Sequence, residues 1–372
     1  MHSLRQFAAH AAVASSVTGG LAFAAPASPS TCKATSQWPG WPSIKHAFIF
    51  GDSYTQTGFN YTGVPPSIDN SLGNPAYPGW TSSNGPNWVD YLTVDYNASR
   101  LLTYNLAFGG ATVDSDIIKP YQDSVLSLKD QVHSEFLPGY TSHGNSDTDN
   151  SETHPSAPNA PAWKGSDSVF AIWIGINDVG NSYSKGPEGV NGTKATNARI
   201  FDVYSGMVDL LYNAGARNFV FLTVPPVDRS PSTVVYGDAA AALEKADIAA
   251  FNSLLKDGLA ADLKAQHADN ANVWAIDTGV LFNTAIDNPT AYPQTAGLKN
   301  TTDFCQAYAN GFSGEDKYIK SCGVSVNKYF WLNNLHPTTA IHKVVAEHVS
   351  NALTAGPNIC SNGVDTKKRA SL

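Results

Sequence analysis

The alternation of short apolar runs with longer helical patterns constrains the fold of this chain most. Runs of five to seven mainly apolar residues occur five times, over 46–50, 101–107, 168–174, 218–224 and 272–276. Such runs are typical of strands buried on both faces of a sheet. Helical spacing of apolar residues occurs between and after them, over 87–96, 124–136, 196–213, 238–266 and 337–353, the last with a proline in its first turn. The order predicts an α/β fold in which right-handed crossovers place helices on both faces of a parallel sheet.

A length of 372 residues allows one large domain or two small ones. No internal repeat is visible, so we expect one domain over residues 25–364. Residues 139–167 are rich in Ser, Asn, Asp, Gly and Pro, which predicts a long polar loop inserted between a helix and a strand. The polar tail 365–372 is predicted to be disordered.

Residues 1–24 have the pattern of a secretory signal peptide. Arg5 precedes an Ala-rich apolar stretch over 7–23, and Ala22-Phe23-Ala24 fits the small-x-small rule for cleavage. A membrane-spanning helix is the alternative, but polar residues and a glycine pair interrupt the stretch and it is short for a span. No later segment approaches about 20 apolar residues. We therefore expect a secreted protein without a membrane span.

The cysteines and glycosylation triplets agree with export. An even number of cysteines, four, in an exported chain suggests two disulfides, and three pairings are possible. Cys305–Cys322 with Cys32–Cys360 is preferred, because the first closes a local loop and the second ties the two ends. No Cys or His spacing indicates a metal site. The Asn-x-Ser/Thr triplets begin at Asn60, Asn97, Asn191 and Asn300.

The charge content excludes some classes of partner. Only 15% of the residues are charged, the formal net charge is −8, and Lys or Arg form no run outside the last eight residues. Nucleic acid is therefore not expected as a partner, since its binding requires a basic surface. Polar loops and glycans are expected to keep so lightly charged a surface in solution.

Chemically useful residues follow the predicted strands. Ser53 comes just after the first strand, Gly110 after the second and Asn177 after the third, while His336 precedes the last helix. Ligands of open α/β sheets bind at the carboxyl ends of the strands, so these residues are expected to converge. Ser53 is then a candidate nucleophile and His336 its base. The backbone N–H groups of Ser53 and Gly110 and the Asn177 amide are candidate oxyanion donors.

The segments Phe50-Gly-Asp-Ser-Tyr54, the Gly110 turn, Gly175-Ile-Asn-Asp178 and His336-Pro337 resemble the four blocks of the SGNH, or GDSL, hydrolases, in family order. Residues 51–60 are further similar to fungal secreted acetylesterases of carbohydrate esterase family 16. The resemblance implies a flavodoxin-like α/β/α sandwich with sheet order 2-1-3-4-5. It also implies a serine esterase with Ser53 as nucleophile, His336 as base, and Gly110 and Asn177 in the oxyanion hole, and requires no cofactor.

The sequence departs from the family pattern at residue 333. The family usually has Asp three residues before the catalytic His, but here that residue is Asn333. An Asp orients the imidazole and stabilises the imidazolium, whereas an Asn can orient it without adding charge. Asn333 itself, a backbone carbonyl, or an Asp from another loop such as Asp303 or Asp316 are the candidates for the third member.

We expect this enzyme to be a monomer that removes acetyl groups from plant cell-wall oligosaccharides. A lipase or phospholipase acting on longer acyl chains is the alternative within enzymes. A weakly active or inactive carbohydrate-binding wall protein on the same fold is the alternative outside them. Trp331 and Tyr54 are candidates for substrate binding, by stacking on a sugar or lining an acyl pocket.

Overall fold

The fold is seen in a computed structural model, which describes residues 32–141, 160–311, 314 and 316–361. In these residues all five predicted runs form strands of one parallel sheet, in the predicted order β2-β1-β3-β4-β5. The strands are β1 (His46–Gly51), β2 (Leu102–Asn105), β3 (Ser168–Trp173), β4 (Asn218–Leu222) and β5 (Asn272–Ile276). β2 is shorter than predicted, because the chain leaves the sheet after Asn105, whose amide donates to the Thr55 carbonyl at 2.8 Å.

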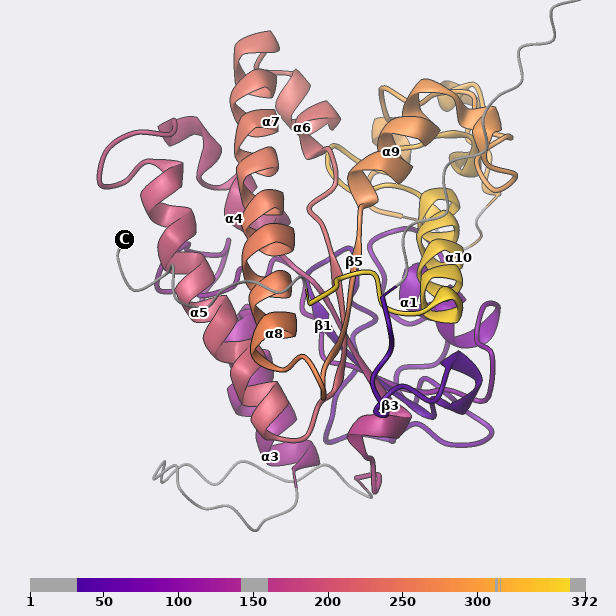
Figure 1. Cartoon of the computed structure of the whole chain (residues 1–372). Helices are drawn as coiled ribbons and strands as arrows, with labels where there is room; N and C mark the ends of the chain where they lie inside the picture. The colour runs from indigo at the N-terminus through magenta and orange to yellow at the C-terminus, as the bar shows by residue number, and fades with distance from the viewer. Residues whose placement is uncertain (1–31, 142–159, 312–313, 315, 362–372) are drawn as a thin grey trace, which may run out of the picture. The chain divides into compact units, whose positions relative to one another are not determined.

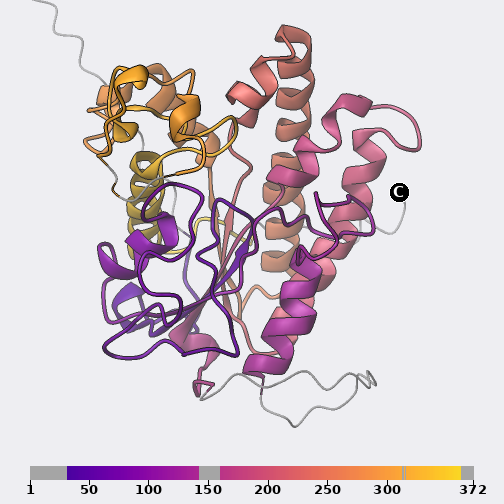
Figure 2. The ribbon, with the colours of Figure 1, turned by 180° about the vertical axis from the view of Figure 1, so that it is seen from behind.

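Helices cover both faces of the sheet and complete a three-layer α/β/α sandwich (Figures 1 and 2). One layer, on the right in Figure 1, holds α1 (Trp88–Val94), α9 (Thr278–Asp287) and α10 (Thr339–Ala355). The opposite layer holds α3 (Leu137–Tyr140), α5 (Thr193–Asn213), α7 (Asp238–Ser253) and α8 (Ala261–Gln266). With helices on both sides, β1 and β3 are buried along their whole length. The predicted fold class is confirmed.

Several helix boundaries differ from the prediction. The helix expected from residue 124 begins at α2 (Leu128–Asp130), because Ser127 and Asp130 form a capping box. It continues through a π-helical stretch, Gln131–Phe136, into α3, so the first residues expected in the 139–167 loop are helical. The last helix begins at Thr339 and not at Pro337, which lies before the N-cap Thr338.

The segment 238–266 is helical throughout, as predicted, with a π-helical stretch (Leu254–Ala260) between α7 and α8. Two shorter helices follow strands: α4 (Ile176–Gly180) after β3 and α6 (Pro231–Val234) beyond β4. The proposed signal sequence 1–24, positions 142–159 of the predicted loop and the tail 365–372 lie outside the described residues.

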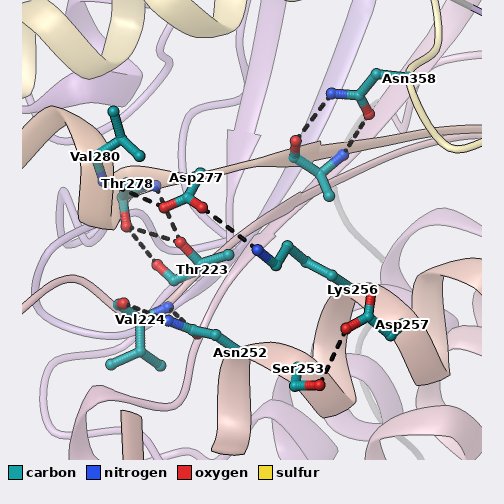
Figure 3. Close-up of polar contacts among 11 residues, drawn as sticks. Thr223, Val224, Asn252, Ser253, Lys256, Asp257, Asp277, Thr278, Val280 and Asn358 are labelled. Atoms are coloured by element: carbon teal, nitrogen blue, oxygen red, sulfur yellow. Dashed lines mark hydrogen bonds and ion pairs between the residues drawn. The ribbon is translucent and has the colours of Figure 1, made fainter. Parts of the chain in front are cut away.

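Side chains tie the ends of β4 and β5 to the neighbouring segments (Figure 3). The Asn252 amide, on α7, brackets Val224 by accepting from its N–H at 2.8 Å and donating to its carbonyl at 2.9 Å. Asp277 caps α9 by accepting from the Val280 N–H at 3.2 Å. Asn358 brackets Ala275 in the same two-bond manner. These bonds fix the carboxyl ends of the strands, the edge at which ligands bind in such folds.

Candidate active site

Ser53 lies in a turn directly after β1, and the local structure before it is closely held. The Gln131 amide brackets Gly51, accepting from its N–H at 3.0 Å and donating to its carbonyl at 2.8 Å. Gly51 has a φ of 156°, and a Cβ there would lie 2.4 Å from the Trp173 carbonyl oxygen. Only glycine therefore fits, and the close approach of β1 to β3 sets the start of the Ser53 turn.

The structure brings Ser53 and His336 together across 283 positions of sequence. His336 Nε2 lies 2.7 Å from Ser53 Oγ. The Tyr54 hydroxyl donates to the Leu335 carbonyl at 2.6 Å, so the residue after the serine is bonded to the residue before the histidine. The Nε2–Oγ distance is that of a base able to take the serine proton.

Asn333 contacts the His336 ring, as expected of a candidate third member of the triad. Its Oδ1 accepts from the His336 and Leu335 N–H groups at 2.8 and 3.0 Å and lies 3.1 Å from His336 Nδ1. Its Nδ2 donates to the Ala309 carbonyl at 3.4 Å, which fixes the amide with its oxygen toward the imidazole. Asp303 and Asp316 were the other candidates for this position. Both lie within the described residues, and neither forms a hydrogen bond or ion pair with the His336 ring.

The imidazole is a neutral base at ordinary pH. Desolvation by the surrounding groups lowers the pKa of His336 to about 4. No carboxylate among the described residues contacts the ring to favour its charged form. Asn333 therefore sets the orientation of the ring, and the ring remains unprotonated and able to accept a proton far below pH 7.

The expected oxyanion donors lie on the turns after β1, β2 and β3. The backbone N–H groups of Ser53 and Gly110 donate to no acceptor within the described part of the chain. Gly110 has a φ of 87°, which favours glycine. The Asn177 amide donates one hydrogen to the Ala111 carbonyl at 2.9 Å, and its second hydrogen remains for a ligand. The geometry is consistent with the role expected of each group.

Asp178 and Asp52, next to Asn177 and Ser53, brace these turns. Both oxygens of Asp178 accept from the Val113 N–H, at 3.1 and 3.2 Å, and so α4 holds the turn after β2. Asp52 accepts from the Tyr54 N–H at 3.0 Å. Burial raises the pKa of Asp52 to about 8 and that of Asp178 to about 7, because the buried charged form is poorly solvated.

Trp331 and Tyr54 are not available to a substrate, and this sequence prediction is wrong. Each side chain is 1% exposed. The Tyr54 ring packs against Trp173 and His342, and its hydroxyl is used by Leu335. Trp331 packs on Phe330. Trp331 lies in the apolar run 329–332, whereas Tyr54 has polar neighbours in sequence, so packing between distant segments, and not a local pattern, decides that both rings are buried.

A pocket of about 800 Å³ opens at His336 and Asn333. One wall is the segment 77–86, and another includes Ala309, Asn310 and Leu332. From the sequence, Tyr77 and Trp80 of this segment were expected near the site, but the segment was not predicted to form a wall of the pocket. Its density of Gly, Pro, Ser and Asn was a loop signal, but no local pattern states which loop reaches the site.

Residues 48–349 match the family described as GDSL-like lipase/acylhydrolase. The chain belongs to this family. It is 38% identical over 312 residues to an acetylesterase of Thermothelomyces thermophilus, covering 83% of this chain and 88% of that protein. It is 27% identical to a thermolabile hemolysin of Vibrio parahaemolyticus, over 71% of this chain and 54% of that protein. The chain also matches the crystal structure of a member of the lipolytic G-D-S-L family from Veillonella parvula. This match covers 84% of this chain and 99% of that protein, with 12% sequence identity and a TM-score of 0.39.

As a GDSL-family member with this acetylesterase relative, the protein is a carboxylic ester hydrolase. Within the described ranges, no group of three or more His, Cys, Asp or Glu residues is placed to hold a metal ion. No described helix is long and apolar enough to cross a membrane.

Both disulfides have the pairing that the sequence favoured. Cys305 is bonded to Cys322, and Cys32 to Cys360, with Cα–Cα distances of 5.6 and 5.2 Å. The Cys305–Cys322 disulfide closes the loop that carries Ala309, whose carbonyl accepts from the Asn333 amide. It therefore stabilises one wall of the pocket at His336.

The four glycosylation acceptors differ in exposure. Asn60 and Asn191 are exposed, whereas Asn97 and Asn300 are half-buried. The Asn97 Nδ2, the atom to which a glycan would be attached, donates to the Thr93 carbonyl. Accessibility therefore favours Asn60 and Asn191.

Proposed function

We propose that this GDSL hydrolase is a secreted serine esterase that removes acetyl groups from plant cell-wall oligosaccharides. The observation that carries the proposal is the Ser53–His336–Asn333 arrangement, with a 2.7 Å contact between nucleophile and base, at the opening of an 800 Å³ pocket. The identity of 38% with an acetylesterase over most of both chains supports acetyl as the acyl group.

The reaction follows from the positions of these groups. His336 Nε2 takes the Ser53 proton as Oγ forms a bond to the acetyl carbonyl carbon. The oxyanion is stabilised by the N–H groups of Ser53 and Gly110 and the second N–H of the Asn177 amide. The C–O bond to the sugar then breaks, and the imidazolium gives its proton to the departing sugar oxygen. Water, deprotonated by His336, releases acetate from Ser53.

Variants of the proposed pair test this mechanism. Ser53→Ala and His336→Ala are each expected to lower kcat about 10³-fold or more, because neither retains the nucleophile–base contact. Initial rates on an acetyl ester, with circular dichroism to show that each variant folds, provide the measurement. Organophosphonate labelling at Ser53 tests the binding-protein alternative: an unlabelled native protein would support a wall protein with an inactive site.

A lipase or phospholipase is the second candidate, favoured by the description of the family as GDSL-like lipase/acylhydrolase. Rates on acetyl, butyryl and palmitoyl esters of one alcohol distinguish the two. We expect kcat/KM to fall steeply from acetyl to palmitoyl, because the hydroxyl and amide side chains of Thr81, Ser82, Asn84 and Asn310 line the pocket among its apolar groups. A flat or rising profile would favour the lipase.

The remaining parts of the proposal concern processing. We propose cleavage after Ala24, a monomer with a single catalytic domain over residues 25–364, and glycans at Asn60 and Asn191 before Asn97 and Asn300. The exposure of the first two asparagines supports this order. N-terminal sequencing of the secreted protein and glycopeptide mass spectrometry are the corresponding measurements.

A further inference from the structure

Trp80 is the exposed exception among the tryptophans. Its side chain is 73% exposed, while six of the other seven tryptophans are at most 8% exposed and Trp163 packs partly against the core. A tryptophan carries about 150–250 Å² of surface that would gain free energy on burial. Tyr121 and Tyr236 are each 74% exposed as well, but neither lines the pocket at His336, whereas Trp80 does, so the exposure of Trp80 indicates a surface that a ligand covers.

The Trp80 ring is held in place. A Cβ at Gly58 would lie 2.7 Å from Trp80 Cε3 and 3.1 Å from Cδ2, so the ring rests against the bare backbone of Gly58. The backbone N–H of Trp80 donates to the Thr57 carbonyl at 2.8 Å. Gln56 Nε2 donates to Ser82 Oγ at 3.2 Å, two residues beyond Trp80. The ring is therefore fixed to the segment that follows Ser53, which favours binding because little flexibility is lost.

Trp80 lies in the same pocket as His336, the proposed base. Trp80 and His336 both line the 800 Å³ pocket, and His336 Nε2 lies 2.7 Å from Ser53 Oγ, so a ligand with its ester at Ser53 is next to the pocket that Trp80 lines. Among the described residues lining the pocket none is Asp, Glu, Lys or Arg. Besides Tyr77, Asn333 and His336, the polar side chains that line it are Thr81, Ser82, Asn84 and Asn310.

This combination matches the chemistry of a neutral sugar ring. A pyranose has an apolar C–H face that can lie on an aromatic ring, and hydroxyl groups at its edge that bond to amides and hydroxyls. A phospholipid headgroup would instead require cationic partners. We propose that Trp80 is the stacking platform of a neutral-sugar subsite, which binds the saccharide whose acetyl group is presented to Ser53. The inference rests on the proposed function and specifies its substrate class.

Kinetics with two substrates test the platform. For Trp80→Ala we expect KM for mono-acetylated xylobiose to rise about ten-fold with little change in kcat, and a smaller change of KM for ethyl acetate, which has no sugar. Trp80→Phe retains an aromatic face and is expected to recover most of the affinity. Tyr236→Ala is the matched control, since Tyr236 is 74% exposed and does not line the pocket. Equal effects on both substrates, or a KM for the sugar ester within two-fold of wild type, would overturn the proposal.

A binding measurement separates this proposal from the proposed catalysis. Ser53→Ala protein is titrated calorimetrically with xylotetraose, which carries no ester, and compared with the Ser53→Ala, Trp80→Ala double variant. A ten-fold weaker Kd in the double variant supports the platform, even if the native enzyme fails to deacetylate sugars. Equal Kd values, or no binding to the Ser53→Ala protein, would overturn it, even if the native protein is an active esterase.

Discussion

Asn333 orients the imidazole of His336, the proposed base, without adding a charge. Its oxygen faces His336 because its Nδ2 donates to the Ala309 carbonyl, which an aspartate at this position could not do with an ionised carboxylate. The pKa of His336 is lowered to about 4 by desolvation. The base is therefore expected to lose activity only when the pH falls toward 4, since a protonated imidazole cannot accept the Ser53 proton.

Asn333→Asp should move this acid limit. A carboxylate 3.1 Å from Nδ1 favours the imidazolium and raises the pKa of His336, so the acid limb of kcat/KM should shift upward by about one pH unit or more. Profiles of kcat/KM from pH 3.5 to 8 provide the measurement. Asn334→Asp places the same charge on the exposed neighbour and should shift the limb much less. An unchanged limb in Asn333→Asp would contradict the assignment of Asn333 as the imidazole partner.

At the scale of elements, α4, which follows β3, holds the turn that follows β2 by hydrogen bonds. Asn177 donates to the Ala111 carbonyl and Asp178 accepts from the Val113 N–H, so two consecutive residues of α4 hold the turn that carries Gly110. The pattern explains why an aspartate is buried next to a proposed oxyanion donor. Its carboxyl binds a backbone N–H that would otherwise be buried without a partner.

Asp178→Ala is predicted to loosen this turn. An unpartnered Val113 N–H costs about 1–3 kcal/mol of unfolding free energy. We expect kcat to fall about 10-fold or more with a smaller change in KM, since the Gly110 N–H binds more strongly to the transition state than to the substrate. Denaturant unfolding and steady-state kinetics measure the two effects. Asp178→Asn retains one acceptor and should lose less. A variant with native kcat but lowered stability would assign Asp178 to folding alone.

Across the described part of the chain, burial raises the pKa of several carboxyl groups into the neutral range. Burial raises the pKa of Asp52 and Glu135 to about 8, and that of Asp90, Asp178 and Glu244 to about 7. In the unfolded chain such groups ionise near pH 4. Their contribution to stability is therefore complete below about pH 4 and is lost as the pH rises to 8. Histidines with lowered pKa values act in the opposite sense, but only below about pH 6.5.

Thermal unfolding should show this balance directly. Between pH 6.5 and 8 these carboxyls account for the main difference between the folded and unfolded chains. We therefore expect Tm to fall over this interval, with a loss of about 1 kcal/mol or more of unfolding free energy. Scanning calorimetry at constant ionic strength gives the measurement. Asp52→Asn cannot ionise and should reduce the slope, whereas exposed Asp316→Asn should not. A Tm that is constant or rises from pH 6.5 to 8 would contradict the buried protonated state.

Much of this could be predicted from the sequence because it depends on local patterns. Apolar runs of strand length predicted five strands, and the residues after them predicted Ser53, Gly110, Asn177 and His336 as neighbours. The short separation of Cys305 and Cys322, 17 residues, favoured their pairing because it closes a local loop. The π-helical continuation at Gln131 and the late start at Thr339 were missed, since capping and bulges depend on contacts beyond the local pattern.

By itself the sequence determined the order of strands and helices along the chain, the residues that follow the strands and the family that it resembles; the order of the strands in the sheet was implied by that resemblance. Only the tertiary structure decided which group turns His336, which aromatic ring is available to a substrate and which loop lines the pocket. The physical reason is that backbone periodicity is encoded locally. Burial and orientation instead depend on contacts between distant segments, so Trp331 is enclosed in the core while Trp80 stays exposed beside the site.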